Sequence, residues 1–267
     1  MRDYPLMIVP TGHVEPVPRR IRAVLGGVTV LDTTSARYVW EWPNYPQYYV
    51  PVDDLAPGTL VDEQRTEQVR GATVHRYGLR AGGLDRPGAA QVYPPDPAAG
   101  AHPARDSLAG LARLDWAALD AWYEEDEEVF VHPRNPYTRV DALRSVRRVR
   151  VERDGAVLAE SACTVMVFET GLPTRYYFNR TEVNFAHLVP SDTVTACPYK
   201  GRTSAYWSIR VGGATHPDLA WAYDFPTRQL LPIAGLVAFY NEQVDIVVDG
   251  VPLARPRTPF FPANASE

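Results

Sequence analysis

The residues with the greatest chemical potential form one short segment, Cys197-Pro198-Tyr199-Lys200-Gly201. Of the 27 lysines and arginines in the chain, Lys200 is the only lysine. A lysine amine can lose its proton and act as a general base or form a Schiff base, whereas an arginine guanidinium stays charged. The positive charge of a lysine can also lower the pKa of a nearby thiol. We therefore interpret Lys200, Cys197 and Tyr199 as candidate catalytic residues.

This interpretation makes demands on the surroundings of Lys200. An amine that works as a base or nucleophile must reach a concave surface, and burial or a second cation must lower its pKa toward neutrality. A structural interpretation stands beside it. Pro198 and Gly201 are typical of a β-turn, Cys197 can be a small buried apolar residue, and codon bias toward arginine explains a single lysine.

Aromatic residues with polar tips follow this segment, and such residues either line a ligand pocket or form the core of a small β domain. Tyr176 and Tyr177, which precede the segment, belong to the same aromatic set, and the candidate ligand-binding residues are Tyr206, Trp207, Trp221 and Tyr223. Successive side chains of a strand point to opposite faces. Only one of Tyr206 and Trp207 can therefore lie beside Lys200.

His132 and Arg134 are two further candidate ligand-binding residues, in the middle of the chain. A histidine with acidic and basic neighbours can transfer protons, and clefts between domains are preferred ligand sites. The alternative role is a salt-bridge clasp between the two halves of the chain. The acidic run just before them, residues 124–128, is typical of a solvated turn.

The composition excludes several classes of protein. Hydrophobic residues make up 45% and charged residues 22% of the 267 residues, as in a globular protein. The net charge of −5 argues against a general nucleic-acid binder. No apolar run approaches the roughly 18–20 residues of a membrane-spanning helix, so we expect no membrane partner.

Cysteine and histidine usage points to the compartment and argues against a metal site. The chain has 2 cysteines and 6 histidines, and the histidines are scattered without ligand spacing, so we expect no disulfide and no structural zinc. The amino-terminal apolar stretch is short and interrupted by proline, unlike a secretion signal. We expect a cytoplasmic protein. No dinucleotide-binding, metalloprotease or nucleophile-elbow motif is present, and no cofactor is indicated.

The chain is similar to itself at an offset of about 128 residues, which is the sign of a duplicated domain. Without a gap, Gly27 falls on Gly155 and Tyr48 on Tyr176. Further along, Tyr93 falls on Tyr223 at an offset of 130. The offsets drift by only a few residues, and the order is kept. We predict a first repeat over 17–130, a linker over 131–144 and a second repeat over 145–262.

The sequence pattern predicts that each repeat consists mainly of β-strands. Alternating apolar and polar residues on either side of Asp154-Gly155 predict a hairpin over 148–161. Residues 228–235 are compatible with one or two helical turns, and by symmetry we predict one short helix in each repeat, within 108–123 in the first. The stretch 82–104 is rich in proline, glycine and alanine and predicts a loose loop.

Several motifs resemble the signature of domain-of-unknown-function family 427. They are 197–201, 206–213, Trp221, Tyr223, 233–235 and 121–134. The resemblance covers both repeats. It implies two tandem copies of a small antiparallel β domain, distantly similar to the β-tent folds that grip small ligands between two sheets. The first repeat departs from the pattern, because Glu67-Gln68-Val69-Arg70-Gly71 stands where the second has the Cys197–Gly201 motif.

The same family is also labelled nucleotidyltransferase-like. That reaction needs paired carboxylates that hold Mg²⁺ and a phosphate-binding glycine loop, and the sequence shows neither pattern. Our first hypothesis is a cytoplasmic small-molecule-binding protein, with an enzymatic role left open, whose ligand meets Lys200 in a pocket of the second repeat. The alternatives are a non-catalytic structural or protein-interaction module and a nucleotidyltransferase-like activity.

Overall fold

The computed structural model describes residues 9–95, 108–258 and 261. The chain divides into two compact units, and the boundary between them follows Pro136. We call residues 7–136 the first domain and residues 137–267 the second domain, and each is described by itself. The expected end of the second repeat, residue 262, lies outside the described residues.

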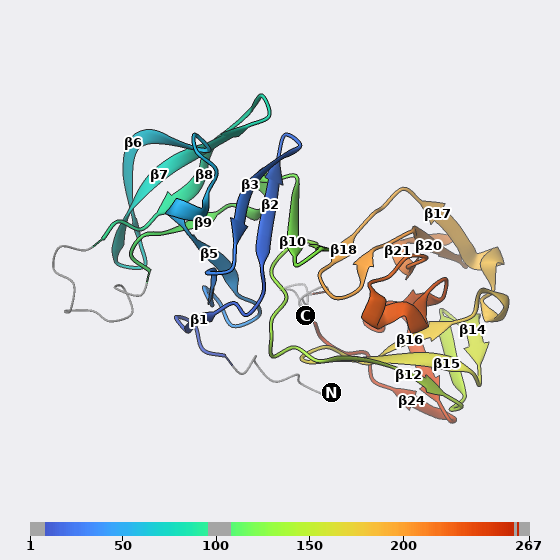
Figure 1. Ribbon diagram of the computed structural model, residues 1–267. Coiled ribbons are helices and arrows are strands. Elements are labelled where there is room, and N and C mark those ends of the chain that lie inside the picture. The colour runs from blue at the N-terminus through green and yellow to red at the C-terminus, as the bar shows by residue number, and fades with distance from the viewer. Residues whose placement is uncertain (1–8, 96–107, 259–260, 262–267) are drawn as a thin grey trace. The chain divides into compact units, whose positions relative to one another are not determined.

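The first domain consists of two antiparallel sheets (Figure 1). Its larger sheet, within the described residues, has the strand order β1 (Val14–Pro16), β4 (Arg37–Val39), β5 (Gln47–Pro51), β9 (Leu111–Leu114), β8 (Leu84–Val92), β7 (Ala72–Ala81) and β6 (Leu60–Val69). Its smaller sheet has the order β11 (Glu127–Val129), β10 (Ala121–Glu124), β2 (Ile21–Leu25) and β3 (Val28–Thr33).

The second domain repeats this topology strand for strand. Its larger sheet has the order β12 (Val140–Ser145), β15 (Thr164–Glu169), β16 (Arg175–Phe178), β22 (Val237–Phe239), β21 (Ala214–Ala222), β20 (Ala205–Val211) and β17 (Leu188–Ser191). Its smaller sheet has the order β14 (Ala156–Ser161), β13 (Val149–Arg153), β23 (Asp245–Val248) and β24 (Val251–Leu253). The second domain also contains a separate two-stranded sheet, in which β18 (Ala196–Cys197) pairs with β19 (Gly201–Arg202).

The register of the strands follows the sequence offset. In the first hairpin the pairing shifts between Ala23 and Val24, and in the second it shifts at the positions 128 residues later, between Val151 and Glu152. The turns of both hairpins place Gly27 and Gly155 at positive φ, +74° and +80°. The mainly β, antiparallel, two-copy fold expected from the sequence is therefore confirmed.

Both faces of each larger sheet are buried in part. Tyr176 points to the main core, which joins both sheets of the second domain, whereas its neighbour Tyr177 points to a separate outer cluster. In the first domain Tyr48 and Tyr49 divide in the same way between a main core and an outer cluster. We call the side of each larger sheet that faces away from the smaller sheet the outer face.

Helical structure in the described residues is limited to 3-10 turns. The second domain contains η3 (Arg180–Glu182), η4 (Phe185–His187) and η5 (Arg228–Ile233), and η5 is the short helix expected near 228–235. In the first domain, η1 (Val52–Asp54) and η2 (Trp116–Ala118) are single turns. The stretch 108–123 contains β9, the single helical turn η2 and the start of β10, where Trp122 is buried and its neighbours Ala121 and Tyr123 are partly exposed.

Two further stretches differ from the sequence-based expectation. Leu84–Val92, expected within a loose loop, forms strand β8, because its backbone completes ladders with β7 and β9. Residues 96–104 of the expected loop are outside the described part of the chain. Val140–Ser145, placed in the expected linker, forms the edge strand β12 against β15 of the second domain.

Candidate functional site

The Cys197–Gly201 segment is the tip of a folded hairpin. In the first domain β6 and β7 run directly into each other through the turn at Arg70 and Gly71. The equivalent strands β17 and β20 separate after Ser191, and the chain between them forms the ladder β18–β19. We call residues 197–201 the hairpin tip. Gly201 permits the turn, because its φ of +97° is one that other residues rarely adopt.

The hairpin tip brings Lys200 to the carboxylate of Glu169, the last residue of β15. The Lys200 amine donates a hydrogen bond to Glu169 Oε2, and both side chains are only 9% exposed. The same amine lies 3.8 Å from Cys197 Sγ. A thiol, an amine and a carboxylate therefore share one largely buried cluster.

The pKa of Lys200 moves opposite to the direction that amine catalysis requires. Burial lowers it, as expected, but the acidic groups of Cys197, Glu169 and Tyr177 outweigh burial and raise it above the ordinary value of a lysine. Burial likewise raises the pKa of the Cys197 thiol, and Lys200 offsets this only in part. The expectation of a lowered amine pKa is thus wrong, because Glu169 supplies a negative charge where the sequence argument assumed a cation or an apolar wall.

The hydroxyl of Tyr177 completes the cluster. Tyr177 is fully buried on β16, and its hydroxyl makes no hydrogen bond of standard geometry among the described residues, although the Trp221 side chain lies close enough to lower the Tyr177 pKa as a hydrogen-bonding neighbour. The Trp221 ring lies beside it, with the ring centroids 6.5 Å apart, in an edge-on arrangement. Burial raises the pKa of Tyr177 to about 12, so the phenol is neutral near pH 7 and can both donate and accept a hydrogen bond.

Two backbone contacts hold the hairpin tip against the loop before η5. The Thr227 amide donates to the Lys200 carbonyl at 3.1 Å, and the Thr227 hydroxyl donates to the Tyr199 carbonyl at 2.5 Å. The Tyr199 side chain is buried. The tip is consequently a well-anchored element rather than a freely extended loop.

The candidate aromatic residues separate by face. Tyr206, Trp221 and Tyr223 belong to the outer cluster that also contains Tyr177. Trp207 points the other way, into the main core of the second domain, so its assignment to the ligand-binding set beside Lys200 is corrected. As the alternation of a strand requires, only Tyr206 of this pair shares the outer face with Tyr177.

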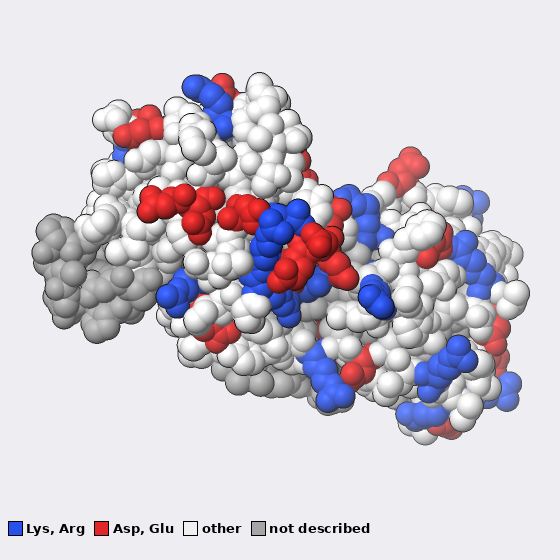
Figure 2. Space-filling view, viewed as in Figure 1, with Lys and Arg blue, Asp and Glu red and all other residues white. Residues whose placement is uncertain are grey.

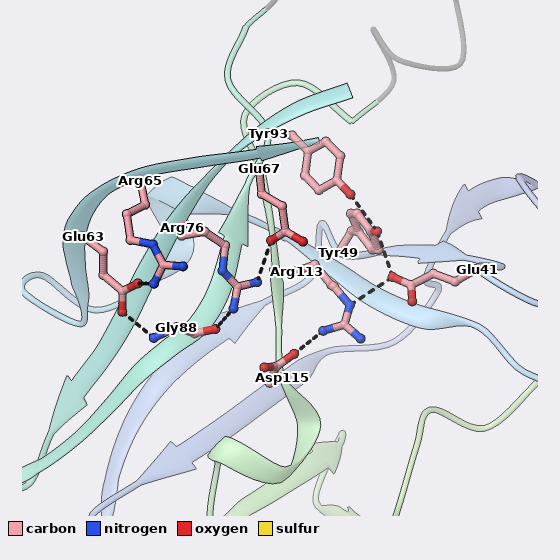
Figure 3. A network of polar contacts seen from close by, with 10 residues as sticks. All are labelled: Glu41, Tyr49, Glu63, Arg65, Glu67, Arg76, Gly88, Tyr93, Arg113 and Asp115. Atoms are coloured by element: carbon pink, nitrogen blue, oxygen red, sulfur yellow. Dashed lines mark hydrogen bonds and ion pairs between the residues drawn. The ribbon is translucent and has the colours of Figure 1, made fainter. Parts of the chain in front are cut away.

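The first domain has a related cluster at the matching corner of its larger sheet (Figure 3). Glu41 is the residue 128 positions before Glu169, and it accepts hydrogen bonds from Tyr49 and from Arg113 Nε, both at 3.0 Å. The Tyr49 and Tyr93 hydroxyls are 3.2 Å apart. The tip of the β6–β7 hairpin contributes Arg70, which donates to the Glu41 carbonyl.

Figure 3 also shows a second group of polar contacts, toward the far edge of the same sheet. Arg76 donates to the Gly88 carbonyl and pairs with Glu67 at 3.7 Å, while Glu63 accepts from the Gly88 amide. These contacts fix the irregular part of β8 after its register shift. Glu67, the residue that aligns with Cys197, thus takes part in an ion pair that supports this strand.

His132 and Arg134 have their described contacts within the first domain. The His132 ring stacks on Tyr45, with the centroids 3.5 Å apart and the planes 8° apart. Arg134 lies 3.6 Å from the buried carboxylate of Glu124, which also accepts from the Tyr48 hydroxyl at 2.6 Å. His132 and Arg134 belong to the first domain, and Lys200 belongs to the second.

Sequence reasoning missed charged residues around the outer cluster. Glu169 was not selected, although the offset of 128 pairs it with Glu41 and so could have identified it, whereas Tyr177 belonged to the aromatic set noted from the sequence. It also missed Arg175, which forms a buried two-hydrogen-bond ion pair with Glu242 at 2.6 and 2.7 Å. The Arg175 guanidinium lies 5.4 Å from the ring centroid of Tyr240. No local sequence pattern signals that long-range pair.

Many charged side chains on the described surface lie next to a group of opposite charge. Figure 2 shows acidic and basic side chains next to one another on the face toward the viewer. Equivalent pairs recur in the two domains, Arg20 Nε with Asp32 at 2.7 Å and Arg148 Nε with Glu160 at 2.8 Å. Among the described residues, no group of three or more His, Cys, Asp or Glu residues is placed to hold a metal ion. No helix in the described part of the chain is long and apolar enough to cross a membrane.

Comparison with known proteins identifies the family of the chain. A search of curated proteins finds no match. A family model described as a domain of unknown function (DUF427) matches twice, over residues 13–125 and 141–250. The two matches cover most of the chain and correspond to its two domains. The chain therefore belongs to the DUF427 family and carries two tandem copies of its domain.

Proposed function

We propose that this chain is a small-molecule-binding protein and that its ligand binds at the outer face of the larger sheet in the second domain. The site comprises the hairpin tip, with Cys197, Tyr199 and Lys200, and the aromatic residues of the sheet. Those residues are Tyr177, Tyr206, Trp221 and Tyr223. The observation that carries the proposal is the buried hydroxyl of Tyr177, whose proton has no acceptor among the described residues, because the neighbouring Trp221 indole can only donate.

An unpartnered buried hydroxyl needs an explanation, because nearly all buried polar groups have hydrogen-bond partners and an unsatisfied one costs about 1–3 kcal/mol. The first domain shows the satisfied arrangement, in which the Tyr49 hydroxyl contacts Glu41 and Tyr93. In the second domain Lys200 engages the carboxylate of Glu169 instead. The Tyr177 hydroxyl is thus available to a polar atom of a ligand.

The electrostatics favour binding over catalysis. The raised pKa of Lys200 keeps its amine charged near pH 7, so it acts as a fixed cation rather than as a base or nucleophile. The raised pKa of Cys197 keeps its thiol protonated. A compact polar ligand with one hydrogen-bonding group that reaches Tyr177 and an apolar part that packs against the aromatic rings fits these properties. Both cysteines are free thiols, which supports a reducing compartment such as the cytoplasm.

A thermal-shift screen over metabolites and nucleotides tests the proposal. The wild type is compared with Tyr177→Phe and with Tyr49→Phe, which makes the same change at the equivalent position of the first domain. The expected result is a compound that raises the melting temperature of the wild type and of Tyr49→Phe but not that of Tyr177→Phe. A compound that stabilises all three proteins equally binds elsewhere and contradicts the proposed site.

One observation favours the alternative of a non-catalytic structural module. The buried Lys200–Glu169 pair and the two Thr227 contacts explain the hairpin tip as an anchored turn without any ligand. Lys200→Arg discriminates between the two functions. If Lys200 meets a ligand, this change weakens the ligand-induced shift in melting temperature. If the residue is only part of a turn, the shift stays the same. Nucleotidyl transfer, which the resemblance names, has no observation in its favour among the described residues.

A further inference from the structure

The outer faces of the two domains differ along one row of paired residues. In each larger sheet the row begins at equivalent tyrosines, Tyr177 in the second domain and Tyr49 in the first. Across the next strands of the second domain the row continues through Ala238, Trp221 and Tyr206. The matching residues of the first domain are Arg113, Gln91 and Arg76. The second domain thus keeps the tyrosine but has one small and two aromatic residues where the first has polar ones.

This difference leaves the proton of the Tyr177 hydroxyl without an acceptor. In the first domain Tyr49 donates to the Glu41 carboxylate at 3.0 Å, and Arg113 contacts the same oxygen. In the second domain the Tyr177 hydroxyl makes no hydrogen bond of standard geometry in the described part of the chain, and the nearby Trp221 indole can only donate. A group that satisfies Tyr177 must therefore accept a hydrogen bond.

The charged groups around Tyr177 are already neutralised in pairs. Lys200 pairs with Glu169, and Arg175, two residues before Tyr177 on the same strand, pairs with Glu242. All four side chains are at most 9% exposed. Burial raises the pKa of the hairpin-tip thiol and of the phenol, so both are uncharged near pH 7. A charged ligand would find no free counter-charge here, which opposes its burial.

We propose that the ligand of the second domain is an uncharged carbonyl compound with an apolar skeleton, whose oxygen accepts a hydrogen bond from Tyr177. This inference rests on the proposed function and names the chemical class of its ligand. The skeleton packs against Trp221 and Tyr206, whose ring centroids lie 6.3 Å apart with an interplanar angle of 29°. Leu236 and Tyr240, which pack against the outer cluster, are only partly buried, so the ligand enters by displacing one of these side chains.

Matched probes that share a phenyl ring test the inference. Acetophenone and methyl benzoate carry an uncharged carbonyl group, whereas benzoate is an anion and benzylamine is a cation near pH 7. Isothermal titration calorimetry measures the binding of each probe to wild type, to Tyr177→Phe and to the matched control Tyr49→Phe. A carbonyl probe should bind wild type and Tyr49→Phe alike but Tyr177→Phe roughly three- to tenfold more weakly, as expected for one lost hydrogen bond. Benzoate and benzylamine should show no binding that depends on Tyr177.

The carbonyl stretch of the bound probe reports the hydrogen bond directly. In the infrared spectrum of isotope-labelled acetophenone, the stretch should lie at lower wavenumber in the complex with wild type than in the complex with Tyr177→Phe, because a hydrogen bond weakens the C=O bond. Weaker binding to Tyr177→Phe with an unchanged stretch would mean that Tyr177 acts through packing, and it overturns the inference.

Two binding results also overturn the inference without deciding the proposed function. In the first, benzoate or benzylamine is the probe whose binding depends on Tyr177, so that the site is kept but the class of ligand is wrong. In the second, neither carbonyl probe depends on Tyr177. The thermal-shift screen over metabolites and nucleotides tests the proposed function separately, and that function fails if no compound in the screen depends on Tyr177.

Discussion

Lys200 and Glu169 form a buried ion pair that fastens the tip of a hairpin to the end of strand β15. In the first domain the equivalent residues, Arg70 and Glu41, are also brought together, but there the guanidinium contacts the Glu41 carbonyl. The Glu41 carboxylate is held by Arg113 of β9 instead. The two domains thus keep an acidic residue at one corner of the sheet, and its charge is neutralised from a hairpin tip in the second domain and from strand β9 in the first.

The first prediction concerns the cost of breaking this pair. Lys200→Met should destabilise the second domain by about 3–5 kcal/mol, because it leaves the Glu169 carboxylate buried without its cation. Urea denaturation with hydrogen-exchange mass spectrometry of peptides from β15 and β16 measures the loss. The double variant Lys200→Met/Glu169→Leu should recover much of the stability, because no buried charge remains. Equal losses in the single and double variants would show that the pair is not the source of the effect.

The second prediction uses the two equivalent tyrosines as a matched pair. Tyr49→Phe removes a hydroxyl that contacts Glu41 and Tyr93, and should destabilise the first domain by about 0.5–1.5 kcal/mol. Tyr177→Phe removes a hydroxyl without a partner among the described residues, so the second domain should be unchanged or more stable. Chemical denaturation of the ligand-free variants measures both. A larger loss for Tyr177→Phe than for Tyr49→Phe would mean that the Tyr177 hydroxyl is satisfied.

The internal repeat is the part of the fold that the sequence predicts best. The hairpin turn, its register shift and one polar contact of the first domain all recur 128 residues later in the second domain. Thr33 donates to Asp54 at 2.5 Å in the first domain, and Ser161 donates to Glu182 at 2.7 Å in the second. Such features depend on residues close in sequence or on strict alternation, and so they can be read from one chain.

The surroundings of Lys200 could not be predicted in the same way. Its pKa depends on Glu169, 31 positions earlier in the chain, and the hairpin tip reaches that residue only because the β17–β20 pair opens before its turn. Strand β8 was missed for a related reason. Pro87 and Gly88 are poor strand residues, but ladders on both sides and contacts from Glu63 and Arg76 hold them in the sheet. In both cases tertiary contacts override the local signal.

The third prediction is a pH dependence from Glu242. Burial raises the pKa of this carboxyl, but hydrogen bonds from Arg175 and Thr258 outweigh burial and lower it. A carboxylate with a lowered folded-state pKa contributes stability above its unfolded pKa, and this contribution is lost as the pH falls through the folded pKa. The difference in melting temperature between wild type and Glu242→Gln should therefore be large near pH 7 and shrink in acid.

A control for this experiment is Glu160→Gln, which removes one partner of a surface pair with Arg148. Surface pairs of this kind contribute about 0–1 kcal/mol, so its melting temperature should stay close to that of the wild type throughout. If the Glu242→Gln difference were constant from pH 7 to pH 3, the change would act through packing rather than through the charge of Glu242.

The fourth prediction distinguishes two glycines that have the same backbone conformation but different neighbours. Gly82 in the first domain and Gly212 in the second open the turns after β7 and β20, with φ of +53° and +59°. A Cβ at Gly82 would overlap the Gly26 carbonyl, whereas a Cβ at Gly212 meets no atom within 4 Å among the described residues. Gly212→Ala should therefore cost only the left-handed strain, about 1–2 kcal/mol. Gly82→Ala carries the same strain and must also push two backbone turns apart, which adds roughly 1–3 kcal/mol.

Hydrogen-exchange mass spectrometry of the β2–β3 and β20–β21 hairpins, read separately, measures the two effects. Equal losses of protection would mean that the contact between Gly26 and Gly82 does not exist in solution.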